Sequence, residues 1–250
     1  LKIKSTYIPH AIEQVFQPVQ SDIRQRLNIP DDAFVVCINA ANQGLAPVRK
    51  AWPEMLQGFA KFQADRKDVY LYLHTDLARP AGINIPGMLE IYQIDHTRVR
   101  SCDQTAYRVG AIPQSYMAEV YSASNVLLST SMGEGFGLAV IEAQACGTPV
   151  IATNFSAQTE LVGAGWLVRW QGTYDPPQGA FLAMPNVNDI YLKLQEAYDA
   201  RDDQELRIKA RQFANGYDAD YVYGTYWRPF LAELESEMTA SNRKKKAYPR

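Results

Sequence analysis

Short apolar runs alternate along this chain with longer segments of helical period. Four runs rich in β-branched and aromatic residues predict strands, at 34–38 (FVVCI), 69–74 (VYLYLH), 125–130 (NVLLST) and 149–152 (PVIA). Their near-continuous hydrophobicity is typical of strands buried on both faces of a parallel sheet. We therefore expect a sheet that is covered by helices on its two sides.

The segments between these runs carry apolar residues three or four positions apart, as amphipathic helices do. Residues 52–62 predict one helix, with Pro53 in its first turn, where a missing N–H costs nothing. Ser115 and Asn188 are predicted N-caps of two further helices, and Tyr121 is placed on the apolar face of the first of these. The alternation of strand and helix predicts an α/β fold, a Rossmann-like three-layer α/β/α domain with a parallel sheet.

Breaks and chain ends divide the sequence only lightly. Two segments rich in Gly and Pro, 78–87 and 172–179, predict surface loops. The last stretch, 241–250 (SNRKKKAYPR), is polar and basic and predicts a disordered tail, which leaves 1–240 as one domain. Its basic residues would allow peripheral contact with a membrane surface or with phosphates, although a solvated tail is the simpler interpretation.

Composition excludes several classes of protein. A net charge of −2 gives no reason to expect a nucleic-acid partner. Cys37, Cys102 and Cys146 are odd in number and form no CxxC motif, which argues against a disulfide framework or a zinc site and favours a cytoplasmic setting. The three histidines lack metal-ligand spacing, so we expect no metal. Among them His74 ends a strand and is interpreted as a structural, hydrogen-bonded residue.

Candidate chemistry gathers after the third predicted strand, where the loop SMGEGFG leads into the helix LAVIEAQACG. Gly135 and Gly137 let a ligand approach the backbone closely, and the N–H groups at the start of the helix can bind a phosphate. Glu134 lies in the loop, where it would meet a sugar beyond the phosphates. Glu142 is surrounded by apolar helix positions and so requires a partner, for which a ribose diol is suitable.

A second loop, NAANQGLAPVRK, follows the first predicted strand and ends in Arg49 and Lys50. Cations at the carboxyl end of a strand would neutralise charge on a leaving diphosphate. Taken alone, each loop has an ordinary explanation, since glycine loops before helices and surface charges are common. Taken together, the two loops favour a site for a sugar linked to a diphosphate.

These residues resemble a known family. EGFGLAVIEAQACGTPVIAT is similar to the signature of glycosyltransferase family 4, of the GT-B fold, in which two glutamates are separated by seven residues. The helix RKAWPEMLQGFAKF, the segment VGAIPQSYMAEVYSASNVLLSTS and the segment TELVGAGWLV resemble further family segments in the same order. The resemblance covers roughly residues 5–170. It departs at Ala51, where the family commonly has glycine, and in the loop AANQG, which lacks an arginine.

The resemblance implies a role for each matched residue. The family transfers a sugar, here expected to be a hexose, from a UDP- or GDP-linked donor with retention of configuration, without a cofactor and usually without a metal. Lys50, with Arg49 as a helper, would hold the diphosphate; Glu134 would contact the donor sugar near the reacting carbon. Glu142 would bind the ribose. Backbone contacts to donor and base would come from the remaining candidates, Gly135, Phe136, Gly137, Leu138, Gly110 and Ile112.

The family has two Rossmann-like domains, and its acceptor-binding N-terminal domain has no counterpart in this sequence. We therefore expect the chain to be the C-terminal, donor-binding half, inactive without its partner domain and with an unknown acceptor. The aromatic residues near the C-terminus, such as Tyr221 and Trp227, would then be either core or exposed. A non-catalytic nucleotide-binding module is the alternative. The motifs of dinucleotide dehydrogenases and P-loop NTPases are absent.

Overall fold

A parallel sheet of six strands forms the centre of the computed structural model, which describes residues 5–43 and 48–247 and side chains as far as residue 239. The strand order is β3-β2-β1-β4-β5-β6, and every neighbouring pair is parallel. The strands are β1 (Phe34–Asn39), β2 (Val69–His74), β3 (Val99–Ser101), β4 (Val126–Ser129), β5 (Val150–Thr153) and β6 (Gly165–Val168). The four predicted strands are confirmed to within a residue at each end. The short strands β3 and β6 lacked an apolar run long enough to predict them.

Both faces of the sheet are buried, which explains the continuous hydrophobicity of the strands. Along β1, Val35 and Cys37 point into one core cluster, while Phe34, Val36 and Ile38 point into the other. Each side chain alternates across the sheet, so both sets must be apolar when helices cover both faces. The predicted fold class is confirmed.

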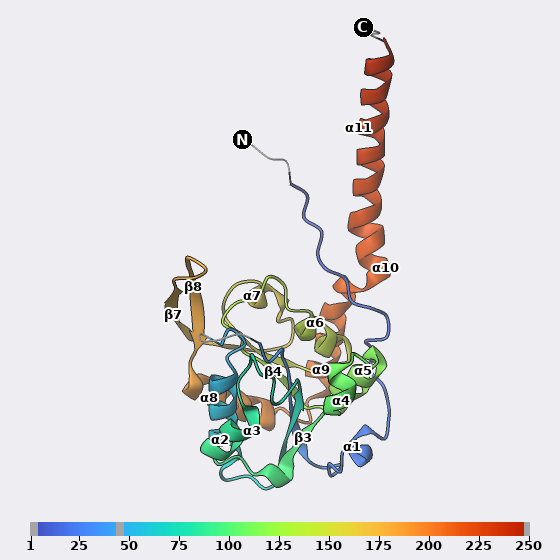
Figure 1. The fold of residues 1–250 in the computed structure, drawn as a ribbon. Helices are drawn as coiled ribbons and strands as arrows, with labels where there is room; N and C mark the ends of the chain where they lie inside the picture. The colour runs from blue at the N-terminus through green and yellow to red at the C-terminus, as the bar shows by residue number, and fades with distance from the viewer. Residues whose placement is uncertain (1–4, 44–47, 248–250) are drawn as a thin grey trace.

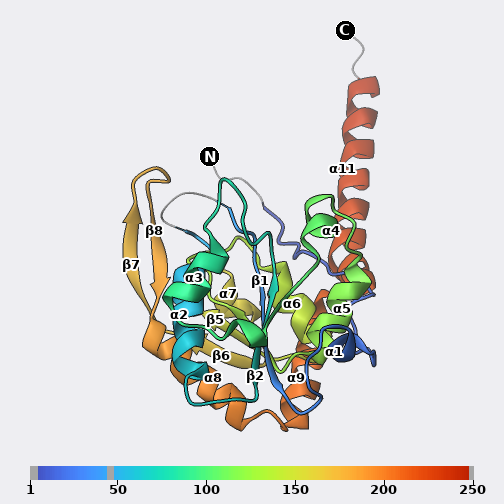
Figure 2. The ribbon, with the colours of Figure 1, turned by 60° about the horizontal axis from the view of Figure 1, so that its bottom comes forward.

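Helices lie on the two faces in two groups (Figure 2). Helices α1, α5, α6 and α9 supply residues to the core cluster of one face, and α2, α3 and α8 to that of the other. Together with the sheet they form the three layers. The α-helices are α1 (Ile23–Arg26), α2 (Trp52–Gln63), α3 (Ile85–Ile91), α4 (Gln104–Arg108), α5 (Gln114–Ala123), α6 (Leu138–Ala145), α7 (Gln158–Leu161), α8 (Val187–Asp199), α9 (Gln204–Ala214), α10 (Ala219–Val222) and α11 (Arg228–Ala247); 3₁₀ segments are η1 (His96–Arg98) and η2 (Asn215–Tyr217), and η3 (Tyr223–Trp227) is a π-helical turn.

Two predicted N-caps were wrong, while the helices themselves are present. Helix α5 begins directly after Pro113, whose ring favours the extended backbone of a cap position, so Ser115 lies inside the first turn. Helix α8 is capped by Asn186, whose side chain accepts a hydrogen bond from the Asp189 N–H at 2.9 Å. The side chain of Asn188 instead accepts a hydrogen bond from Lys61 at 2.6 Å.

A β-hairpin replaces the loop that was predicted at 172–179. Strands β7 (Trp170–Asp175) and β8 (Ala180–Pro185) pair antiparallel beside the main sheet (Figure 1), so only 176–179 form the turn. The inner side of the hairpin packs Leu182 against Met132 and Ala51. Sequence analysis missed the hairpin because β7 (WQGTYD) is mostly polar and exposed, and the apolar run of β8 (AFLAMP) was not assigned to a strand.

The C-terminal helix α11 extends away from the rest of the molecule (Figure 1). It includes 241–247, where the sequence predicted a disordered tail; no Gly or Pro interrupts the helix after Pro229, and long side chains favour helix there. Residues 248–250 of the predicted tail lie outside the described part. The aromatic side chains of Tyr221 and Trp227 are exposed, which decides between the two expectations for them.

Candidate functional site

The sheet places the candidate site at the point where the strand order reverses. Strands β1 and β4 are hydrogen-bonded neighbours, yet the helices that follow them, α2 and α6, cover opposite faces. In doubly wound sheets, this arrangement opens a crevice at the carboxyl ends of the two strands, where ligands bind. The loop after β1 leads to Arg49 and Lys50, and the loop after β4 leads to Glu134.

The structure brings these three charged side chains together. Lys50 Nζ donates a hydrogen bond to Glu134 Oε1, and Arg49 Nη1 lies 3.1 Å from Glu134 Oε2. Arg49 Nη1 also donates to the carbonyl of Gly133 at 2.5 Å. Burial alone would raise the pKa of Glu134, but the hydrogen bond from Lys50 and the nearby cations hold that pKa below its usual value. Glu134 is therefore an ionised carboxylate beside two cations.

Backbone contacts hold the two charged loops against each other. The Met132 N–H donates to the Arg49 carbonyl at 2.8 Å, and the Ser156 hydroxyl accepts from the Glu134 N–H at 3.0 Å. Ala51, between Lys50 and helix α2, is buried and has a left-handed backbone with φ of +52°. This conformation favours glycine, which gives a physical reason for the glycine that the resemblance leads one to expect there.

Helix α6 presents its N-terminus beside this cluster. Gly137 precedes the helix with φ of +112°, a backbone that L-residues rarely adopt. The N–H groups of Leu138 and Ala139 come too early to find an acceptor within the helix, whereas the Val140 N–H donates to the Gly137 carbonyl at 3.0 Å. Leu138 is exposed, and a side chain at Gly135 would meet open space. The ring of Phe136 packs against those of His10 and Tyr217, at centroid distances of 5.1 Å and 5.7 Å.

Glu142 has the polar partner that its apolar helix requires. The Tyr121 hydroxyl donates a hydrogen bond to Glu142 Oε2 at 3.1 Å, and Asn39 Nδ2 donates to the Tyr121 oxygen at 2.7 Å. Burial raises the pKa of Glu142, and the charge of Glu13 raises it further, whereas the bond from Tyr121 lowers it. The sequence analysis did not identify either residue as part of the site. The helical spacing of Tyr121 is that of a core residue, and the one available signal for Asn39 was that a polar residue ends a buried strand.

Gly110 and Ile112 lie in the turn between α4 and α5. Gly110 is exposed with φ of +67°, and Ile112 packs partly on the core that α5 and α6 share. In the part of the chain that the structure describes, no hydrogen bond or ion pair joins this turn to Glu134 or Glu142. The structure thus brings together Arg49, Lys50 and Glu134, and it leaves the base-contacting role of Gly110 and Ile112 untested.

The remaining polar candidates are buried. His74 ends β2 beside Tyr72 and Tyr107, and burial lowers its pKa to about 4. The three cysteines are free and buried.

Within the described residues, no group of three or more His, Cys, Asp or Glu side chains is placed to hold a metal ion. Among the same residues, no helix combines the length and the apolar character that crossing a membrane requires.

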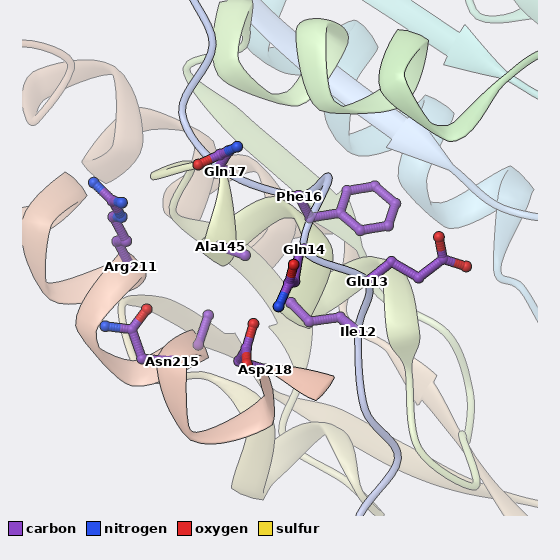
Figure 3. Close-up of a pocket in the computed structure, with 10 residues that line it drawn as sticks. Ile12, Glu13, Gln14, Phe16, Gln17, Ala145, Arg211, Asn215 and Asp218 are labelled. Atoms are coloured by element: carbon purple, nitrogen blue, oxygen red, sulfur yellow. The ribbon is translucent and has the colours of Figure 1, made fainter. Parts of the chain in front are cut away.

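A separate pocket of about 310 Å³ lies between the N-terminal segment and α9 (Figure 3). Its lining is mostly polar and includes Gln14, Arg211 and Asp218. Two of its lining residues adjoin the candidate site: Ala145 lies three positions after Glu142 in α6, and Glu13 is the residue whose charge raises the pKa of Glu142. None of the residues predicted from the sequence to bind a ligand lines this pocket.

Comparison with known proteins finds similarity to glycosyltransferases. The family model described as "Glycosyl transferases group 1" matches residues 105–213. The O-antigen chain mannosyltransferase B of Escherichia coli is 29% identical over 174 residues, which are 60% of this chain and 44% of that protein. The chain thus spans less than half the length of this curated relative.

Solved structures extend the likeness over almost the whole chain. The sucrose-phosphate synthase of Thermosynechococcus elongatus has a TM-score of 0.70 and 25% identity, over 94% of this chain and 52% of that chain. Anabaena Alr3699/HepE, solved in complex with UDP-glucose, has a TM-score of 0.64 and 18% identity, over 92% of this chain and 57% of that chain. Residues 105–213, which include both glutamates of the candidate site, therefore carry the sequence pattern of group 1 glycosyltransferases, on the Rossmann-like fold of one half of a GT-B glycosyltransferase.

Proposed function

We propose that this chain is the donor-binding half of a retaining glycosyltransferase of family 4, which transfers a hexose from a UDP- or GDP-linked donor without a metal. The observation that carries the proposal is the cluster of Arg49, Lys50 and Glu134 at the carboxyl ends of β1 and β4, beside the N-terminus of α6. Two cations and a helix N-terminus suit a diphosphate. A carboxylate next to them suits the hydroxyls of the attached sugar.

Each residue receives a role from its position. Lys50 and Arg49 bind the diphosphate and neutralise the charge that develops on it as the glycosidic bond breaks. The N–H groups of Leu138 and Ala139, which follow Gly137 at the start of α6, bind the same phosphates, and Glu134 contacts the sugar near the reacting carbon. Glu142 accepts hydrogen bonds from the ribose hydroxyls, and the turn of Gly110 and Ile112 faces the base through its backbone.

The share of relatives that the chain covers supports a partner domain outside it. A span of 44% of the mannosyltransferase and 52% of the synthase chain is the share expected for one of two domains of similar size. We propose that the missing domain is N-terminal and binds the acceptor, so the isolated chain binds donor but transfers little or no sugar. The acceptor is a glycan, lipid or protein. A cytoplasmic setting, with peripheral contact to a membrane through the basic end of the chain, is part of the same proposal.

Titration calorimetry of the chain against UDP, GDP, UDP-glucose and GDP-mannose tests the proposal. One nucleotide series should bind with micromolar to millimolar affinity in buffer containing EDTA, and Glu142→Ala should weaken that binding. If none of the four ligands binds at millimolar concentration, the proposal is contradicted. Binding of nucleoside diphosphates with no contribution from an attached sugar would favour the non-catalytic module instead.

A further inference from the structure

The chain of hydrogen bonds that ends on Glu142 has a fixed direction. Asn39 Nδ2 can only donate, so the Tyr121 oxygen accepts there at 2.7 Å, and the Tyr121 proton is left to donate to Glu142 Oε2 at 3.1 Å. Burial raises the pKa of Tyr121 well above its usual value, which keeps this hydroxyl a donor at physiological pH. The three side chains come from β1, α5 and α6, which meet at the switch point of the sheet.

Tyr121 is the rigid member of this chain. Its side chain is fully buried in the core between the sheet and helix α6, and its carbonyl accepts a hydrogen bond from the Thr148 hydroxyl at 2.6 Å. Glu142 is only partly buried, and its flexible side chain would otherwise sample several rotamers. One hydrogen bond from a fixed phenol therefore restricts where the carboxylate lies. An ionised carboxylate accepts about four hydrogen bonds, so capacity remains for two neighbouring hydroxyls.

We propose that Tyr121 is a positioning residue, which holds the Glu142 carboxylate in the orientation that binds a vicinal diol. The inference rests on the proposed function, because the diol is the ribose of the donor nucleotide. Tyr121 and Glu142 then recognise the ribose together. Tyr121, although it is a core residue, contributes to the discrimination between ribose and 2′-deoxyribose. Asn39 supports the pair by fixing the direction of the Tyr121 hydroxyl.

The test compares UDP and GDP with their 2′-deoxy forms by titration calorimetry on the full chain. The wild-type chain should prefer the ribose form by about 10- to 150-fold, the range for one hydrogen bond to a charged group. Tyr121→Phe keeps the ring and removes the hydroxyl, so the affinity for the ribose form should fall several-fold while that for the deoxy form changes little. Tyr116→Phe is the matched control, because Tyr116 lies on the same helix and bonds to Tyr72 at 3.2 Å; it should keep the wild-type preference.

A double-variant cycle separates positioning from a general packing effect. If Tyr121 acts through Glu142, Tyr121→Phe should cause no further loss of UDP or GDP affinity in a Glu142→Gln background. If the phenylalanine variant folds poorly, Asn39→Ala tests the same chain and should also narrow the preference for ribose.

Three outcomes overturn the inference, and they can be told apart. A Tyr121→Phe chain with native melting and an undiminished ribose preference removes the role of Tyr121 alone. Equal binding of ribose and deoxyribose forms by the wild-type chain removes the ribose assignment of Glu142, while the proposed nucleotide site stands. Absence of binding to all four nucleotides removes the proposed function and this inference with it.

Discussion

Lys50 and Glu134 form an ion pair, and substitution of each should change the affinity for nucleotide in opposite directions. Their side chains are 22% and 12% exposed, so the pair is shielded from solvent but not isolated from it. Two unit charges about 4 Å apart interact by roughly 4 kcal/mol at an effective dielectric constant of about 20. The net value of a hydrogen bond to a charged group is about 1.5–3 kcal/mol once desolvation is included.

Lys50→Gln removes a cation that the proposed site uses for the diphosphate, so it should weaken binding of UDP or GDP by about 10- to 150-fold. Glu134→Gln removes the carboxylate that competes for Lys50, so the same nucleotides should bind as tightly or more tightly, while the gain in affinity from an attached sugar is lost. Titration calorimetry at one fixed ionic strength measures both effects, because salt screens exposed charges.

Lys61→Gln is the control for net charge. Lys61 is an exposed lysine of α2 that donates a hydrogen bond to Asn188, and its removal should leave nucleotide affinity unchanged. A Lys50→Gln chain that binds nucleotide within twofold of the wild-type chain would contradict the proposed role of Lys50. So would a Glu134→Gln chain whose nucleotide binding is weakened as much as that of Lys50→Gln, since the two charges would then act on the ligand in the same sense.

Three further predictions concern stability and titration. Burial raises the pKa of Glu142, so folding favours its protonated form. Glu142→Gln should therefore raise the melting temperature at pH 7.5, and the difference from the wild-type chain should shrink as the pH falls through the raised pKa. A lower melting temperature at pH 7.5 would contradict this prediction. Gly165→Ala places a Cβ 1.9 Å from the Val150 carbonyl oxygen and should cost about 3 kcal/mol or more in urea unfolding, whereas Gly179→Ala, also at positive φ but in open space, should cost about 1 kcal/mol; equal costs would show that φ alone matters. Burial lowers the pKa of His74 to about 4, so an NMR titration should find the midpoint of its ring there. The stability that comes from burying the neutral ring should be lost as the pH falls from about 6.5 towards 4. A midpoint near 6.5 would show that the ring is solvated.

The sequence predicted those parts of the fold that local pattern encodes. The four long strands are confirmed because burial on both faces leaves a run of apolar residues, as in β1. The predicted start of α6 near Gly137 is also confirmed, since Gly137 adopts a positive φ and the apolar helix begins at the next residue. The hairpin β7–β8 was missed, since the exposed strand β7 (WQGTYD) has no such run, although the run AFLAMP of β8 was a signal for its partner strand.

The candidate site divides in the same way. Glu134 and Glu142 were recognised because both lie within a few residues of one glycine loop, so a single segment carries the signal. That Glu142 needs a polar partner also followed from its apolar surroundings. The identity of the partner did not, because helical spacing assigns Tyr121 to the core and contains no information about the hydroxyl at the end of its ring.

The pattern of residues along the chain was enough to predict a three-layer α/β domain with a glycine loop and two acids after a buried strand. The distant residues that those acids meet became known from the three-dimensional fold. Lys50 and Glu134 are 84 positions apart, and Asn39 and Tyr121 are 82 apart. These contacts exist because β1 and β4 pair as neighbours at the switch point, and that pairing depends on strand order across the whole sheet, which no local pattern of apolar and polar residues specifies.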